Sequence, residues 1–507
     1  MPHILKLPDE LLLDIIVGLQ RDDLENFTLT CKRLFNVGHA SLQEHRTLKQ
    51  KYSKILSGTL LREDFEEDVY RKHPIHLLLE VLENPTIVEY PIKMIVGDCE
   101  HEDNEYHDED TVMPDCREAI SAAVSQCAYV RPRQRESITN EIILGRVDAT
   151  VALLLTILPN LVSVEFYNLS TNSVYLLDVL WSIAGTQLGI QVETVVDENA
   201  ESTRDESANE DVEENSFEGS QALTKLTHIL VDRYDPGMEG NEDFCLLAPF
   251  VALPSARSLS GAMIEGSWFP TFGRRLESGL KDITLTESCF DPEVFDLFIS
   301  KIAALTSFTF HFARTVRSET EWNPRSIIQS LTKHQGDSLE KLDLAGDDRG
   351  KEHFIGSLTE FRNLKVIRIE STMFIEEAKV TVDDKPPNSM SWPFNLVDRS
   401  LSAQAHDVEQ VHRVVDLLPR SVQTLTMTDW KIGKAITLKM MEGLAASKTQ
   451  EFPVLRLLEF EKRVDLPLEV RDSLEKAGIE VRHPLEDSHR MLVEFHEKYG
   501  LQYPLDI

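Results

Sequence analysis

The chain has 507 residues, 86 of them acidic and 52 basic, which gives a formal net charge of −34. So large a negative charge disfavours direct binding to nucleic acid, because phosphates repel carboxylates. No apolar run is long enough to cross a membrane, no signal peptide is recognisable, and the six cysteines form no Cys-x-x-Cys pair, so we expect reduced thiols in the cytoplasm or nucleus. A chain of this length predicts several domains or an elongated repeat.

The first 45 residues predict a small helical module. Leu7-Pro8-Asp9-Glu10 places a proline and two carboxylates where a helix would begin, and Gly18 weakens that helix near its end. Asp22 or Asp23 can cap a second helix; the apolar pattern continues through Cys31, Leu34 and Phe35, and Gly38 can stop it. Apolar residues share one face of these helices at helical spacing: Leu11, Ile15, Leu19, Leu24, Cys31 and Leu34. So short a segment buries little apolar surface by itself and favours a partner, although a helical hairpin capping a larger domain is the simpler alternative.

The pattern Leu-Pro-x-Glu-Leu, Leu-x-x-x-Asp-Leu and Cys-Lys-Arg-Leu resembles an F-box, the module that binds the Skp-type adaptor of cullin–RING ubiquitin ligases. The resemblance covers residues 5–45 and departs at Leu34-Phe35, where many family members carry a tryptophan. It implies the adaptor-binding residues Leu7, Pro8, Leu11, Ile15, Leu19, Leu24, Cys31 and Leu34.

The next segment predicts a basic linker helix over residues 43–56, and we assign 46–73 as a helical linker. Pro74 then opens a leucine-rich helix to Glu83, and Pro85 precedes a turn and a buried strand that ends at Val96. This stretch is similar to the segment that comes after the F-box in many fungal F-box proteins.

Beyond it, a short pattern recurs, Leu-x-x-Φ-x-Φ with Φ apolar, which predicts the strand of a leucine-rich repeat. Strong copies begin at Leu161, Leu226, Leu280, Leu305, Leu339, Leu364, Val422 and Leu455, and a weaker copy is Leu259/Ala262/Ile264.

Helical patterns lie between the copies, opened by Asp291-Pro292 and Asn323-Pro324 and continued by an apolar face from Val408 to Leu418. The first positions are 21 to 65 residues apart, whereas regular repeats need about 20–29. We therefore predict an α/β fold: an all-α F-box over 1–45, then an irregular leucine-rich-repeat-like solenoid of parallel strands and helices over 74–507. One such strand would mean nothing in an α/β protein, but nine copies favour the solenoid.

Two insertions account for the longest gaps. Residues 197–218 hold ten carboxylates and one arginine, which predicts a disordered acidic insertion. Residues 383–388 predict a second, shorter loop.

In leucine-rich repeats, the residues flanking the last apolar strand position point to the concave face, away from the helices. Seven of eighteen such positions here are acidic and one is arginine: Glu165/Tyr167, Leu230/Asp232, Met263/Glu265, Thr284/Thr286, Thr309/His311, Asp343/Ala345, Arg368/Glu370, Thr426/Thr428 and Glu459/Glu461. A negatively charged face would attract basic partners, so we expect Glu165, Asp343, Glu370, Glu459 and Glu461 to bind a target, although an acidic face can also serve solubility alone.

Catalytic signatures are missing from the sequence: no phosphate-binding glycine loop, nucleophile elbow or His-Glu-x-x-His occurs. Cys99, His101, His107 and Cys116 could bind zinc, but their spacing does not form ligand pairs, so a solvated loop is the simpler interpretation. We expect no enzyme activity, metal or other cofactor.

The F-box and repeat resemblances together imply a substrate-recognition subunit of a cullin–RING ubiquitin ligase. The F-box would bind the adaptor and the repeats would bind a target protein. The alternative is an interaction scaffold that binds the adaptor and acts outside ubiquitination.

Overall fold

The computed structural model describes residues 4–19, 21–57, 70–71, 73–97, 116–167, 173–189, 222–232, 242–266, 277–313, 323–346, 354–376, 411–428, 434–461 and 466–482. The chain forms two compact units. Unit 1 comprises Met1–Gly237 and Cys245–Ser260, and unit 2 comprises Met238–Phe244 and Gly261–Ile507.

Unit 1 begins with three helices that come after a short 3₁₀ turn, η1 (Ile4–Lys6). They are α1 (Asp9–Val17), α2 (Arg21–Thr28) and α3 (Lys32–Tyr52). The remaining helical elements of this unit are α4 (Pro74–Glu83), η2 (Pro85–Glu89), α5 (Arg117–Gln126), η5 (Pro132–Gln134), α6 (Arg135–Ile143), α7 (Val147–Ile157), α8 (Val174–Leu188) and α9 (Ala248–Val251).

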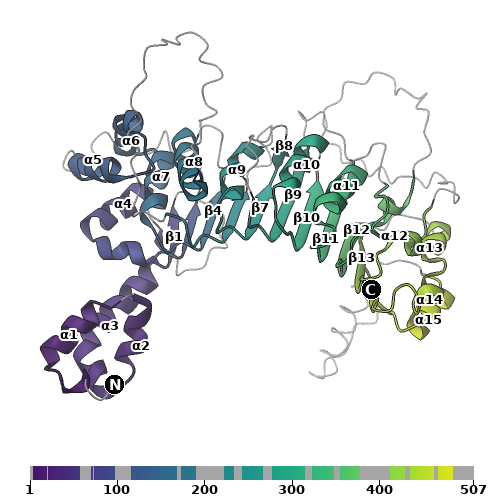
Figure 1. Cartoon of the computed structure of the whole chain (residues 1–507), viewed down its shortest axis with the longest axis horizontal. Coiled ribbons are helices and arrows are strands. Elements are labelled where there is room, and N and C mark those ends of the chain that lie inside the picture. Colours follow the sequence, from purple (N-terminus) through teal and green to yellow (C-terminus); the bar gives the residue numbers. More distant parts are fainter. Residues whose placement is uncertain are drawn as a thin grey trace, which may run out of the picture. The chain divides into compact units, whose positions relative to one another are not determined.

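The strands of unit 1 form a sheet in the order β7-β5-β4-β3-β1-β2, and the pairs from β5 through to β2 are parallel. Their bounds are β1 (Lys54–Ser57), β2 (Tyr70–Arg71), β3 (Lys93–Val96), β4 (Ser163–Tyr167), β5 (His228–Asp232) and β7 (Ser258–Ala262), whose last two residues belong to unit 2. Helices separate most of these strands in the chain, as a parallel sheet requires (Figure 1).

Unit 2 repeats the arrangement in the order β15-β14-β13-β12-β11-β10-β9, with every pair parallel. The strands are β9 (Asp282–Phe290), β10 (Ser307–Phe312), β11 (Lys341–Gly346), β12 (Val366–Glu370), β13 (Thr424–Thr428), β14 (Leu457–Phe460) and β15 (Glu480–Arg482). Two short strands, β6 (Glu242–Asp243) and β8 (Ile264–Gly266), extend β9 in a side sheet.

The helical elements of unit 2 are η7 (Phe244–Leu246), α10 (Pro292–Ser300), α11 (Pro324–Gln335), η9 (Ser371–Phe374), α12 (Val414–Leu417), α13 (Lys434–Met441), α14 (Leu444–Ser447) and α15 (Leu468–Lys476). The first of these, η7, crosses the boundary between the units in the sequence: Phe244 belongs to unit 2, and the next two residues belong to unit 1. In Figure 1, α10 and α11 lie along the same side of their strands. The predicted fold class, parallel strands alternating with helices in a solenoid-like order after N-terminal helices, is therefore confirmed.

The recurring leucine pattern works as predicted, because its first residue is buried at every strong copy. At most steps one carbonyl accepts two consecutive N–H groups of the next repeat. Val162 O, for example, accepts from Thr227 and His228, and Lys281 O accepts from Thr306 and Ser307. The leucine before each strand and this shared carbonyl fix the register. Each fully buried leucine contributes about 2 kcal/mol of transfer free energy.

The register predicted for the weak copy at Leu259/Ala262/Ile264 is wrong. Thr227 O accepts from Arg257 and Ser258, so the residue before this strand is Ala256 and the aligned positions are Leu259 and Gly261. Met263, with φ of 57°, turns the chain between β7 and β8. The residues that align with the predicted inward pair Met263/Glu265 are therefore Ser260 and Ala262, and Glu265 instead pairs with Cys289 in the side sheet.

Helix starts agree with the sequence better than helix lengths do. Asn323 caps α11 by accepting a hydrogen bond from Ser326 N at 2.9 Å, whereas Asp291 precedes α10 without a side-chain cap bond. The apolar face was expected to run from Val408 to Leu418. Within its described part, 411–418, the helix covers Val414–Leu417, and Val411 is engaged in a β-bridge with Ile375.

The predicted linker helix ends earlier than expected, and its last three residues belong to the sheet. Helix α3 runs to Tyr52, and Lys54–Ser57 then forms β1, which pairs with β3. Ile55 and Leu56 are buried there, so their burial outweighs the helical pattern of the residues before them. The predicted insertion 197–218 and loop 383–388 lie outside the described residues.

Candidate adaptor-binding and target-binding surfaces

The three N-terminal helices enclose a small apolar core of their own. It consists of Leu12, Ile16, Leu24, Leu34 and Leu42, all at most 2% exposed. The module therefore packs inward through one side of each helix.

Gly38 does not stop a helix, contrary to the prediction from sequence, but lies inside α3 at the closest approach of the three helices. A Cβ atom there would lie 2.8 Å from Thr28 Cγ2 and 3.0 Å from Ile16 Cδ1. The glycine lets α3 pack against the other two helices, and this close approach outweighs its poor helix propensity.

Arg33 holds the start of the module in place. Its guanidinium donates to the Asp9 carboxylate at 2.6 Å, to Leu7 O at 2.8 Å and to Leu5 O. The motif Cys-Lys-Arg-Leu thus has an internal role, because its arginine fixes the chain segment that contains Leu7 and Pro8.

Two apolar flanks of α1 remain outside the module's core. An α-helix turns by about 100° per residue, so Leu11 and Ile15 lie on one side of the core residues, and Leu13 and Val17 lie on the other. Leu11, Leu13 and Val17 are 48%, 39% and 63% exposed, and Leu29 at the end of α2 is also exposed. Exposed apolar side chains in such number on three short helices are typical of a docking surface.

The eight predicted adaptor-binding residues divide into three groups. Pro8 and Leu11 are exposed, and Leu7, Ile15, Leu19 and Cys31 are half-buried. Leu24 and Leu34 are fully buried in the module's core, so their assignment to the adaptor surface is wrong as a matter of direct contact. They support the surface from beneath, because the core they fill positions α1.

Sequence reasoning missed Leu13, Val17 and Leu29. The first two are four residues apart and could have been found as a second apolar stripe on α1. The sequence prediction assigned one apolar side to α1, the stripe Leu11/Ile15/Leu19. The helix in fact has three apolar sides: a buried side and two flanks.

On the sheet of unit 2, the side chains opposite the apolar core form an open face, which we define by Thr309, His311, Asp343, Arg368, Glu370, Thr426, Glu459 and Glu461; all but the buried Thr426 are at least partly exposed. Arg368 lies at its centre and donates from Nη1 to both oxygens of Asp343, at 2.9 and 3.0 Å, and from Nε to Glu461 at 2.8 Å. Burial alone would lower the pKa of Arg368, but these two carboxylates raise it above its ordinary value. The His311 imidazole lies 3.2 Å from Asp343.

The predicted target-binding carboxylates are therefore not equivalent. Asp343 and Glu461 share the single cation Arg368, and Glu165, on β4 of unit 1, pairs with Lys93 at 2.6 Å. Glu459 accepts from the Thr426 hydroxyl and Glu370 from Gly346 N, both neutral donors. Because Arg368 offsets one negative charge, the open face of unit 2 is less acidic than its number of carboxylates alone suggests.

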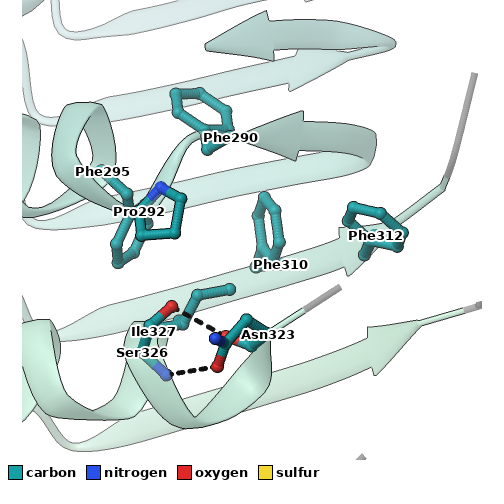
Figure 2. Close-up of a pocket in the computed structure, with 8 residues that line it drawn as sticks. All are labelled: Phe290, Pro292, Phe295, Phe310, Phe312, Asn323, Ser326 and Ile327. Carbon is teal, nitrogen blue, oxygen red and sulfur yellow. Dashed lines mark hydrogen bonds between the residues drawn. The ribbon is translucent and has the colours of Figure 1, made fainter. Parts of the chain in front are cut away.

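A cavity of about 10 Å³ lies near the carboxyl ends of β9 and β10, lined by Phe290, Pro292, Phe295, Phe310, Phe312, Asn323, Ser326 and Ile327 (Figure 2). It has room for about one water molecule. Figure 2 shows Asn323 turned back onto Ser326, with the aromatic rings around them. The surrounding rings belong to a phenylalanine core in which, for example, the centroids of Phe290 and Phe310 are 6.1 Å apart. This cavity is a packing feature and not a ligand site.

The described residues offer neither a metal site nor a membrane span. No group of three or more His, Cys, Asp or Glu side chains that could hold a metal ion occurs among them. Of the four residues weighed for zinc, only Cys116 lies within these ranges, so the expected absence of a metal stays a prediction. None of the described helices is long and apolar enough to cross a membrane.

Comparison with known proteins gives structural likenesses but no sequence match. No family model and no curated protein sequence matches the chain. Among solved structures, a chain of the yeast Rad7 and Elc1 complex aligns over 95% of this chain and 94% of its own length, with 10% identity and a TM-score of 0.27. At that identity and TM-score the likeness carries no argument about partners or activity.

Proposed function

We propose that this protein is a substrate-recognition subunit of a cullin–RING ubiquitin ligase, with the N-terminal module bound to a Skp-type adaptor and the repeats bound to a target protein. The chain itself would contribute no catalytic residue. It would hold the target near chemistry carried out by another subunit, in the cytoplasm or nucleus.

The observation that carries the proposal is the exposed apolar surface on α1 and α2. The module has a complete core of its own, yet it leaves Leu11, Leu13, Val17 and Leu29 in solvent. Covering such side chains with a partner gains about 25 cal/mol for each Å² of apolar area removed from water. The F-box resemblance of the same residues names the kind of partner.

The experiment is capture of the adaptor by the full-length chain after co-expression. The double variants Leu11→Asp/Ile15→Asp and Leu13→Asp/Val17→Asp each place two charges on one flank of α1. We expect at least one of them to weaken capture more than 100-fold, because charges at a desolvated apolar contact cost several kcal/mol.

The matched control is Leu144→Asp, since Leu144 is 67% exposed and comes directly after α6, outside the module. It should leave capture unchanged. Failure of the wild-type chain to bind the adaptor, or full binding by both double variants, would overturn the proposal. Cullin in the captured complex separates the ligase role from a scaffold that acts outside ubiquitination.

A further inference from the structure

The N-terminal module is joined to the first repeat by a defined set of side-chain contacts. Arg21 on α2 forms an ion pair with Glu89 at 2.8 Å, and its guanidinium carbon lies 5.6 Å from the centre of the Tyr90 ring. His45 on α3 places Nδ1 3.2 Å from the Tyr90 hydroxyl. We call these four residues the joint.

A second contact lies at the end of α3. The Tyr52 hydroxyl donates to Glu80 on α4 at 2.5 Å, and Lys51 donates to the Tyr52 oxygen at 2.7 Å. This contact contains no histidine and provides a reference for the joint.

His45 is the unusual member of the joint, because it is 3% exposed and its Nε2 atom has no hydrogen-bond partner among the described residues. A neutral imidazole leaves one weak polar atom unsatisfied at this site. A protonated imidazole would bury a full charge with an unpaired N–H, which is far more costly.

The charged groups around His45 do not compensate for such a charge. Arg21, Arg46 and Lys49 are cations, and two nearby carboxylates are already engaged: Glu25 by Arg46 at 2.9 Å and Lys49 at 3.4 Å, and Glu89 by Arg21. A third, Glu44, is exposed to solvent and acts on Tyr90. Tyr90 contributes a hydroxyl whose pKa is raised, chiefly by burial, so it stays neutral near pH 7. Glu25 and Glu89 are therefore already paired with cations, and the exposed Glu44 is screened by solvent.

We propose that the joint is a pH-sensitive contact, closed while His45 is neutral and opened when His45 takes up a proton. This pH sensitivity follows from the burial of a histidine between two packed parts of unit 1, and it does not depend on the proposed function.

The direction of the effect is set by the two states of His45. Burial lowers the pKa of His45 in the closed joint, and the Glu25 carboxylate does not fully offset this. In an open joint the imidazole is solvated, with an ordinary pKa of about 6.5. The closed state is therefore fully favoured above about pH 6.5 and loses stability as the pH falls below it. The pKa of Glu25 is lowered, mainly by its hydrogen bond to Arg46, so this carboxylate stays ionised over the same interval.

The test is amide hydrogen exchange of the full-length chain at pH 7.5, 6.5 and 5.5, with labelling times scaled for the intrinsic pH dependence of exchange. The reporters are the N–H groups of Ile87 and Tyr90, which donate to Asn84 O and Ile87 O in and beside η2. One group with an open-state pKa of about 6.5 and a lowered pKa in the closed state predicts a rise of up to about tenfold in the opening constant between pH 7.5 and 5.5.

Three variants decide the outcome. His45→Gln, which cannot titrate, should abolish the rise, whereas His39→Gln should keep it, because His39 is exposed on the same helix. Tyr90→Phe removes the hydroxyl but leaves His45 in place, so exchange should be faster at every pH and the rise should remain. A wild-type chain without the rise, an unchanged rise in His45→Gln, or its loss in Tyr90→Phe would overturn the proposal.

Discussion

The open faces of the two units have the same backbone pattern and opposite chemistry. In unit 1 the positions on that face include Leu56, Ile95 and Tyr167, which pack together and are at most 6% exposed. In unit 2 the corresponding rows hold Asp343, Arg368 and Glu461, which are about a quarter to a third exposed and form an ion-pair network. The strand register does not dictate what this face carries. In unit 1 the face is part of the apolar packing, and in unit 2 it presents polar groups to solvent.

The largest expected effect comes from breaking the apolar face of unit 1. Ile95→Ala should lower the free energy of unfolding by about 3 kcal/mol, because it removes buried methyl groups and leaves a cavity. Thr309→Ala on the open face of unit 2 is the control and should change stability by less than about 0.5 kcal/mol. Urea unfolding of both variants measures the difference, and equal losses would contradict the distinction between the faces.

A smaller effect is expected when the charged network of unit 2 loses its centre. Arg368→Met leaves the carboxylates of Asp343 and Glu461 without their shared cation and should cost about 1 kcal/mol, since these groups are partly solvated. The loss should shrink in 1 M NaCl, where charge repulsion is screened. Lys93→Met is the comparison, because it removes a single pair, with Glu165, and should cost less. A loss that does not change with salt would show that Arg368 acts through packing.

The smallest effect concerns target association. Glu370→Gln and Glu459→Gln together remove two negative charges from this face, and should slow the association of a basic target a few-fold at low salt without changing stability. Asp343→Asn should slow it less, because Arg368 already offsets that charge. Stopped-flow mixing at two salt concentrations distinguishes them. Equal association rates for all variants would show that these charges do not contribute to target binding.

The strands could be predicted from sequence because each strong copy begins with a residue that the fold buries completely. The β7 register could not, because Ala256 occupies the leucine position and Gly261 the last apolar one, so two of the three signals are missing.

The helical module was predicted in outline, but the role of Gly38 was not. A glycine at a helix end and a glycine at a close helix contact are the same letter in a sequence, and only the neighbouring Thr28 and Ile16 decide between them.

The adaptor surface was predicted in part for a similar reason. Periodicity identifies which residues of α1 are apolar, but Leu11, Leu12 and Leu13 are consecutive leucines, and only packing shows that the middle one points inward. The joint was not predicted, because it depends on His45 and Tyr90, which are 45 residues apart.

The shared carbonyl, which accepts two N–H groups of the next repeat at most steps, keeps the strand register independent of the length of the connection. The same step joins β9 to β10, whose first positions are 25 residues apart, and β12 to β13, whose first positions are 58 apart. Connection length is therefore separate from register, and doubling a loop adds only about 0.6 kcal/mol of closure entropy. The longer connections are suitable sites for inserting an affinity tag or a fluorescent domain, which would report on the protein in cells while the strands keep their pairing.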